Sequence, residues 1–193
     1  MIRAKTRWGK FLIPSTGIVT KRMLFVLACF IISGCLGVPN NVRPVSDFEL
    51  NRYLGQWYEI ARLDHSFEKG LVNVTAEYSI REDGGVNVVN RGFSTKHKKW
   101  NEANGKAYFV NGVEEGYLKV SFFGPFYGSY IIFELDKENY QYAFVSGPDL
   151  SYLWLLSRIP EVSDEVISDF VKQAKTLGFD TSGLIMVNQK PPS

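Results

Sequence analysis

One stretch of strict alternation constrains the fold more than any other feature of the 193-residue sequence. From Val72 to Arg81 every second position is apolar and the positions between are polar or charged; the apolar set is Val72, Val74, Ala76, Tyr78 and Ile80. Successive side chains of a β-strand point to opposite faces, so this pattern predicts a strand with one buried and one solvated face. Such a strand is stable only within a sheet whose apolar face is covered.

Shorter segments of the same type recur along the chain, separated by turn-forming residues. Asp83-Gly84-Gly85 and Asn111-Gly112 mark tight turns, because glycine readily takes the positive φ that hairpin turns need. Repeated short strands with turn signals between them are typical of a β-sandwich or a β-barrel. We expect eight strands, at residues 57–63, 71–81, 86–93, 106–110, 117–123, 130–135, 140–146 and 152–158.

A single helix is predicted after the last of these strands. Ser163 is a favourable N-cap residue, and Gly178 is placed to end the helix as its C′ residue. Between them one apolar stripe recurs at helical spacing, formed by Val166, Phe170, Ala174 and Leu177. A short final strand is expected at residues 184–187.

These elements predict an all-β fold. Eight consecutive antiparallel strands close most simply into an up-and-down β-barrel, whose interior is either filled by side chains or able to hold one small ligand. The C-terminal helix would bury its stripe against the outside of this barrel. We assign residues 51–190 to the barrel domain, residues 35–50 to a linker with turn formers, and residues 191–193 to a tail.

The N-terminal residues 1–34 are interpreted as a signal peptide. Lys21 and Arg22 precede the apolar run 23–32, and small residues follow at Ser33 and Gly34. Ten apolar residues are too few to span a bilayer, which takes about 20, so a retained transmembrane anchor is the weaker alternative. Because this signal is complete from Met23 onward, the true start can lie near that residue.

The charge balance of the remaining chain argues against a nucleic-acid partner. The first 22 residues contain six bases and no acid, and the rest of the chain has sixteen bases against twenty acids. A domain with this negative balance lacks the basic footprint that nucleic-acid binding needs. The two cysteines, Cys29 and Cys35, precede the domain, so no disulfide can form within it.

Several residues at the two ends of the predicted barrel resemble those of the lipocalin family. Gly55-Gln56-Trp57-Tyr58 resembles the family's G-x-W-[FY] motif at the first strand, and Arg158 stands where lipocalins place an arginine over that tryptophan. The resemblance implies that Gly55, Trp57 and Arg158 plug one end of the barrel, where a guanidinium on an indole face gains a cation–π attraction.

Two longer phrases, residues 57–62 and 120–128, resemble the bacterial outer-membrane lipoprotein branch of the family. One departure is that Glu138-Asn139-Tyr140 stands where lipocalins carry a T-D-x-Y motif.

Ile32-Ser33-Gly34-Cys35 resembles the bacterial lipobox. The resemblance implies cleavage before Cys35, diacylglycerol on its thiol and an acyl chain on its new amino group, and no other cofactor is expected. Leu36, where inner-membrane retention would favour Asp, implies a lipid-anchored protein of the outer membrane with its domain outside the bilayer. The alternative is ordinary secretory cleavage beside an incidental cysteine.

An enzymatic function has little support in the sequence. The only histidines, His65 and His97, lie in polar segments where we expect surface residues, so a histidine-based metal site is not predicted. Ser66 lacks the strand–turn–helix context of a nucleophilic serine, and no glycine-rich phosphate loop precedes the helix. The few enzymatic lipocalins use a thiol inside the barrel, which this domain lacks.

Binding of an apolar ligand is better supported. We expect a fatty acid or a lysophospholipid, since each buried CH₂ contributes about 0.8 kcal/mol. The alternative is that the same side chains pack a closed core. The expected lining consists of Val72, Val74, Ala76, Tyr78, Ile80, Tyr108, Leu118, Val120, Phe122, Tyr142, Phe144 and Trp154.

The loops at the open end would decide which partners the barrel meets. Lipocalin topology implies that residues 64–70, 95–101, 124–128 and 147–150 surround the mouth. Lys96, Lys98 and Lys99 there can contact an anionic head group, or can form an ordinary solvated turn. The turn 124–128 is unusually apolar for a hairpin tip and can contact a membrane or a second subunit. A second hypothesis is a filled barrel whose aromatic tip, residues 123–127, docks another envelope protein or a second copy as a homodimer.

Overall fold

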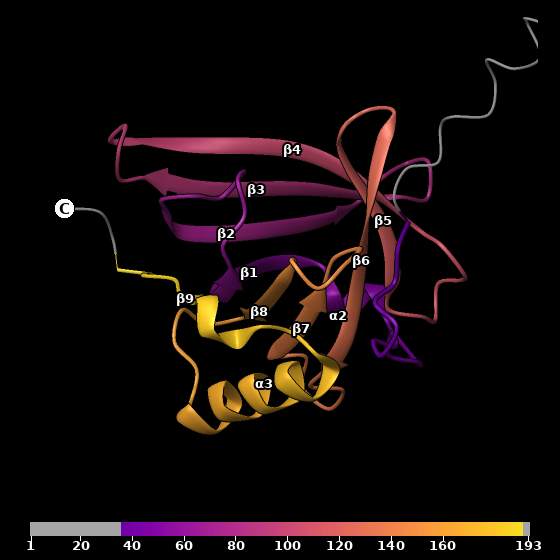
Figure 1. The fold of residues 1–193 in the computed structure, drawn as a ribbon. Helices are drawn as coiled ribbons and strands as arrows, with labels where there is room; N and C mark the ends of the chain where they lie inside the picture. Colours follow the sequence, from indigo (N-terminus) through magenta and orange to yellow (C-terminus); the bar gives the residue numbers. More distant parts are fainter. Residues whose placement is uncertain (1–35, 191–193) are drawn as a thin grey trace, which may run out of the picture. The chain divides into compact units, whose positions relative to one another are not determined.

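The computed structural model describes residues 36–190. The predicted signal peptide, Cys35 and the tail 191–193 lie outside the described residues. The described chain forms a nine-stranded antiparallel sheet in the order β2-β3-β4-β5-β6-β7-β8-β1-β9, and pairing of β2 with β1 closes the first eight strands into the predicted barrel (Figure 1). The elements are α2 (Leu50–Tyr53), β1 (Gly55–Leu63), β2 (Leu71–Ile80), β3 (Val86–Ser94), β4 (Lys99–Phe109), β5 (Tyr117–Phe123), β6 (Phe126–Leu135), β7 (Tyr142–Ser146), β8 (Leu153–Ser157), α3 (Asp164–Leu177), η2 (Thr181–Gly183) and β9 (Leu184–Met186).

The strands β4 and β6 begin several residues before the apolar pattern predicts. β4 begins at Lys99, because an unbroken ladder with β3 runs from Ser94↔Lys99 to Val86↔Ala107. Residues 101–104 are exposed on both faces and include no large apolar side chain, so backbone pairing rather than side-chain periodicity keeps them in the strand. β6 begins at Phe126, which pairs with Phe123 across a two-residue turn.

The helix α3 packs outside the barrel as predicted. Ser163 caps its first turn by accepting a hydrogen bond from Val166 N, and Gly178 ends it at a φ of 97°. Phe170 and Ala174 are fully buried, and the Phe170 ring meets that of Phe144 on β7 at 5.0 Å between centroids. The protein therefore has one apolar cluster inside the barrel and a second between the barrel and α3.

The barrel is closed at the end where β1 begins. Arg158 lies over the indole of Trp57 at 3.9 Å and donates hydrogen bonds to the backbone oxygens of Arg52, Gln56 and Tyr140. The Trp57 Nε1–H donates to Tyr53 O at 2.7 Å, so the indole is fixed at its edge as well as its face. These contacts join α2, β1 and β8 into one plug.

We predict that Arg158→Lys lowers the free energy of unfolding by about 1–3 kcal/mol, because lysine keeps the charge but loses the planar, forked hydrogen bonding. Urea unfolding of the protein from residue 36 onward measures this loss. Arg91→Lys is the matched control, since Arg91 bonds only exposed Glu77 and Glu102, and we expect a loss below about 1 kcal/mol. Equal losses in the two variants would show that the plug does not depend on the guanidinium.

Candidate functional site

A cavity of about 110 Å³ lies inside the barrel above the plug. At roughly 10–15 Å³ for each water-sized sphere, it holds about ten such spheres and is narrow for a ligand site. Its walls are mostly apolar and come from strands around the whole barrel. Seven of the twelve residues expected to line it do so, namely Val74, Ala76, Tyr78, Leu118, Val120, Phe122 and Trp154.

The structure places the other five expected residues away from the cavity. Val72 precedes an irregularity in the β2–β3 register, at which Asn73 takes a φ of 51° and is buried, and Ile80 is exposed at the end of β2. Tyr108 donates a hydrogen bond to Asp83 at 2.9 Å. Tyr142 and Phe144 point to the opposite face of β7 and pack in the cluster beneath α3.

Sequence reasoning also missed lining residues. Val86 and Val88 alternate on β3 in the same way as the β2 residues, so that signal was present in the sequence. The others come from segments without a periodic pattern or are polar; they are Phe48, Leu50, Tyr53, Glu59, Phe67, Glu68, Thr75, Asn90, Ala107, Ser129, Tyr130 and Leu156.

A buried ion pair lies on the β1 wall of the barrel. Arg62 Nη1 donates to Glu59 Oε1 at 2.7 Å, and both side chains are almost fully buried. A shift in the β1–β8 register between Glu59 and Ala61 accompanies this pair. Arg62 Nη2 also donates to Glu68 O at 3.0 Å, so the arginine ties the β1 wall to the loop between β1 and β2.

The β1–β2 loop carries a second acid into the barrel. The Trp154 indole N–H donates to Glu68 Oε2 at 3.2 Å, and His65 Nε2 lies 3.0 Å from the same oxygen. The His65 ring stacks on Phe67 at 4.0 Å between centroids. The prediction that His65 is a surface residue is therefore wrong, because this loop folds inward and buries the imidazole.

Three tyrosines form a polar group near the plug. The hydroxyl of Tyr130 lies 2.8 Å from that of Tyr53 and 2.9 Å from that of Tyr78. Burial is the main cause that raises the pKa of each of the three hydroxyls above its ordinary value. They are accordingly neutral hydrogen-bonding groups at neutral pH.

The charged groups that line the cavity are both acids. Glu59 and Glu68 reach it, and no lysine or arginine does so among residues 36–190. Burial, followed by the neighbouring Glu68, raises the pKa of Glu59, while the Arg62 guanidinium opposes that rise. The interior is therefore unfavourable for an anionic ligand group and favourable for an apolar one.

No three His, Cys, Asp or Glu side chains between residues 36 and 190 gather as metal ligands would. None of the helices described here has the length and apolarity needed to cross a bilayer.

A barrel plugged at one end around an apolar cavity defines a small ligand-binding β-barrel. Residues 48–189 match the model of the lipocalin-like domain, and the chain belongs to this family. It is 62% identical over 170 residues to the outer membrane lipoprotein Blc of Vibrio cholerae, covering 88% of this chain and 99% of that protein. Mouse apolipoprotein D is 31% identical over 154 residues, covering 76% and 80% of the two chains.

Solved structures agree with the fold. Insecticyanin from the tobacco hornworm Manduca sexta superposes with a TM-score of 0.63 at 22% identity, covering 79% of this chain and 87% of that one. Lobster apocrustacyanin A1 gives a TM-score of 0.60 at 20% identity, covering 80% and 94%. At these identities the likeness concerns the barrel architecture.

We predict that Arg62→Met lowers the free energy of unfolding by about 3–5 kcal/mol, because it leaves Glu59 buried without its partner. The loss should be smaller at pH 5 than at pH 8. A raised pKa in the folded state means that the carboxyl favours folding while it is protonated, and this contribution is lost as pH rises through the folded pKa.

Urea unfolding at the two pH values measures the loss, and the double variant Glu59→Gln/Arg62→Met is the control. Removal of the carboxylate should recover part of the stability and abolish the pH dependence. A single-variant loss that is the same at pH 5 and pH 8 would contradict the argument.

Proposed function

We propose that this protein binds a single-chain lipid, either a fatty acid or a lysophospholipid, with the acyl chain inside the barrel. The observation that carries the proposal is the mostly apolar cavity inside a barrel whose one end is plugged by Trp57 and Arg158. A hydrocarbon chain needs burial rather than specific polar contacts, and each CH₂ removed from water contributes about 0.8 kcal/mol. The function proposed is that of a binding protein and not of an enzyme.

The distribution of charge supports an orientation for this ligand. Glu59 and Glu68 line the cavity, so a carboxylate or phosphate would be repelled from the interior. Exposed lysines stand instead in the β3–β4 turn, at Lys96, Lys98 and Lys99. We therefore infer that the acyl chain enters first and that its anionic head group remains at the mouth.

We further propose that Cys35 is lipidated and holds the domain on the outer membrane. The support is the lipobox at residues 32–35 and the relatives named outer membrane lipoprotein, of which the Escherichia coli protein is 50% identical over 164 residues, covering 84% of this chain and 92% of that protein. When cells are fed a radiolabelled fatty acid, the unaltered protein should carry the label on a denaturing gel and Cys35→Ser should not. Equal labelling of the two proteins would contradict a lipid anchor at this residue.

Filling the cavity should abolish lipid binding. Ala76 lines the cavity on β2, and its neighbour Glu77 is exposed on the opposite face of the same strand. We predict that Ala76→Trp weakens binding of the fluorescent fatty acid cis-parinaric acid at least tenfold, whereas Glu77→Trp, which adds the same side chain outside, leaves it within twofold. Lysophosphatidylcholine should displace the probe from the unaltered protein.

Circular dichroism spectra and urea unfolding would establish that each variant is folded. Val120→Trp introduces the same bulk from β5 on another side of the cavity, in case Ala76→Trp fails to fold. Unchanged binding in a folded cavity-filled variant would refute the proposed site. It would favour the alternative of a filled barrel that acts through its surface.

A further inference from the structure

The chain enters the described structure at the mouth of the barrel. Gly37 lies so close to the β7–β8 loop that a Cβ on it would be 2.5 Å from Pro148 O. From there the chain runs to the plug: Val45 exchanges backbone hydrogen bonds with Ile132 and Gly116, and Phe48 N donates to Glu114 O. Residues 36–48 therefore connect the open end to the closed end.

This course fixes where an anchor on Cys35 must attach. Cys35 precedes Gly37 by two residues, and two residues of extended chain span at most about 7 Å. A lipid on that cysteine consequently joins the domain beside the β7–β8 loop and not beside the plug. Because consecutive strands are antiparallel, the β1–β2, β3–β4 and β5–β6 turns lie at this same end.

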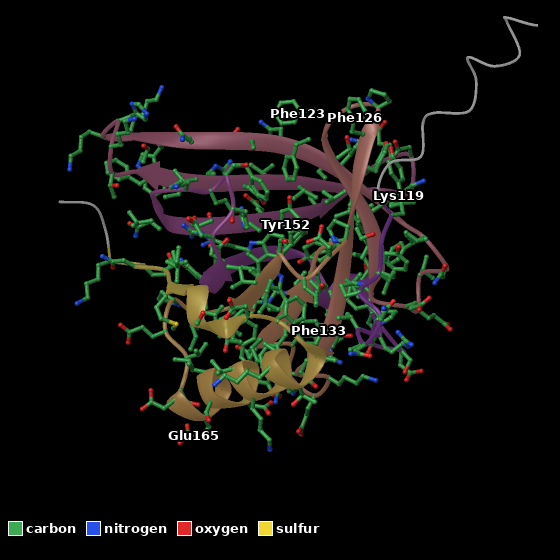
Figure 2. The ribbon with its side chains drawn as sticks, viewed as in Figure 1. Lys119, Phe123, Phe126, Phe133, Tyr152 and Glu165 are labelled. Carbon is green, nitrogen blue, oxygen red and sulfur yellow. The ribbon has the colours of Figure 1, made fainter. Side chains whose placement is uncertain are left out.

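The mouth also carries a concentration of exposed aromatic side chains. Phe123 and Phe126 face each other across the β5–β6 turn with 82% and 69% of their surfaces exposed, and Figure 2 shows both at the tip of this hairpin. Trp100, at the start of β4, is 55% exposed. Neither phenylalanine lines the cavity, so ligand binding does not account for their exposure.

Exposed charge at the mouth differs from that of the domain as a whole. The β3–β4 turn carries three exposed lysines, Lys96, Lys98 and Lys99, and no acid. The other mouth loops add one exposed base, Lys69, and two exposed acids, Asp64 and Asp149, so the mouth has two more bases than acids. Residues 36–190 together have sixteen bases and twenty acids. Trp100 directly follows Lys98 and Lys99, and aromatic and basic side chains at one end of a domain suit the interface of a bilayer that contains anionic phospholipid.

We propose that the mouth docks on the surface of the membrane that holds the anchor, with Phe123, Phe126 and Trp100 in the lipid interface and the β3–β4 lysines against anionic head groups. This inference rests on the proposed lipid anchor at Cys35, but not on the identity of the ligand in the cavity. The short tether and the exposed aromatic side chains lie at the same end of the barrel. The anchor therefore keeps the aromatic side chains near the membrane, and their contact with the lipid keeps the mouth against it.

Trp100 provides a native probe for this contact. The full lipoprotein would be reconstituted into vesicles of phosphatidylethanolamine and phosphatidylglycerol in which part of the lipid is brominated near the head group. Bromine quenches only indoles close to the lipid. Trp57 is fully buried in the plug and Trp154 lines the cavity, so the part of the quenching that Trp100→Phe removes reports on the outer surface of the mouth. We expect brominated lipid to quench the fluorescence, and we expect this quenching to fall at least twofold in Trp100→Phe.

The aromatic turn is tested by the double variant Phe123→Ser/Phe126→Ser, in which quenching of Trp100 should also fall at least twofold. The matched control is Val113→Ser/Ile159→Ser, which removes two exposed apolar side chains from the closed end and should leave quenching unchanged. Absence of quenching, or equal quenching in the two double variants, would overturn the proposal. The proposal would also be overturned if the unaltered protein showed no quenching and formed a cross-linked dimer that is lost in Phe123→Ser/Phe126→Ser. In that case a second copy, and not the membrane, would cover the turn.

Vesicle flotation and fatty-acid binding distinguish the separate failures. Unaltered protein that does not float with vesicles would refute both the anchor and the docked orientation, whereas flotation without quenching would refute the orientation alone. Phe123→Ser/Phe126→Ser should still bind cis-parinaric acid, and Ala76→Trp should still show quenching of Trp100. Failure of lipid binding in the cavity therefore leaves the docking result intact.

Discussion

Closure of one end by Trp57 and Arg158 is the constraint on which the cavity depends. A barrel open at both ends would expose its apolar interior to water, whereas a plug leaves one route in and out. The guanidinium covers the indole and bonds three backbone oxygens from two separate parts of the chain. The plug thus fixes β1 against β8, and it also decides which set of loops forms the mouth.

Buried charge at the other end of the cavity has a different role. The Arg62 guanidinium pairs with Glu59 on β1 and donates hydrogen bonds to the backbone oxygens of Glu68 and Leu71, so it holds the β1–β2 loop inward. Replacing such groups with apolar ones is often neutral or stabilising, which makes their contribution to stability a weak explanation for their presence. Under the proposed function, an acidic lining that disfavours anionic head groups would give these residues a role in orienting the ligand.

The sequence predicted the fold well because its signals were local and redundant. Alternation in β2, the capped stripe of α3 and the Gly55–Trp57 motif each specified an element independently. The cavity was harder to predict, because β7 is apolar on both faces, so no pattern showed that Phe144 faces α3. His65 and Glu68 occupy a polar loop whose inward course depends on Arg62, a contact that no local pattern encodes.

The position of the first described residues joins these features into one arrangement. The mouth is the only end from which the plug permits entry, and it is also the end beside which residues 36–38 lie. If the proposed anchor and docking surface hold the mouth against the membrane, a lipid leaves the bilayer beside the opening of the cavity. The proposed anchor, the aromatic turn and the opening of the cavity lie at one end of the barrel, so the path from the bilayer to the cavity is shorter than it would be for a freely diffusing barrel.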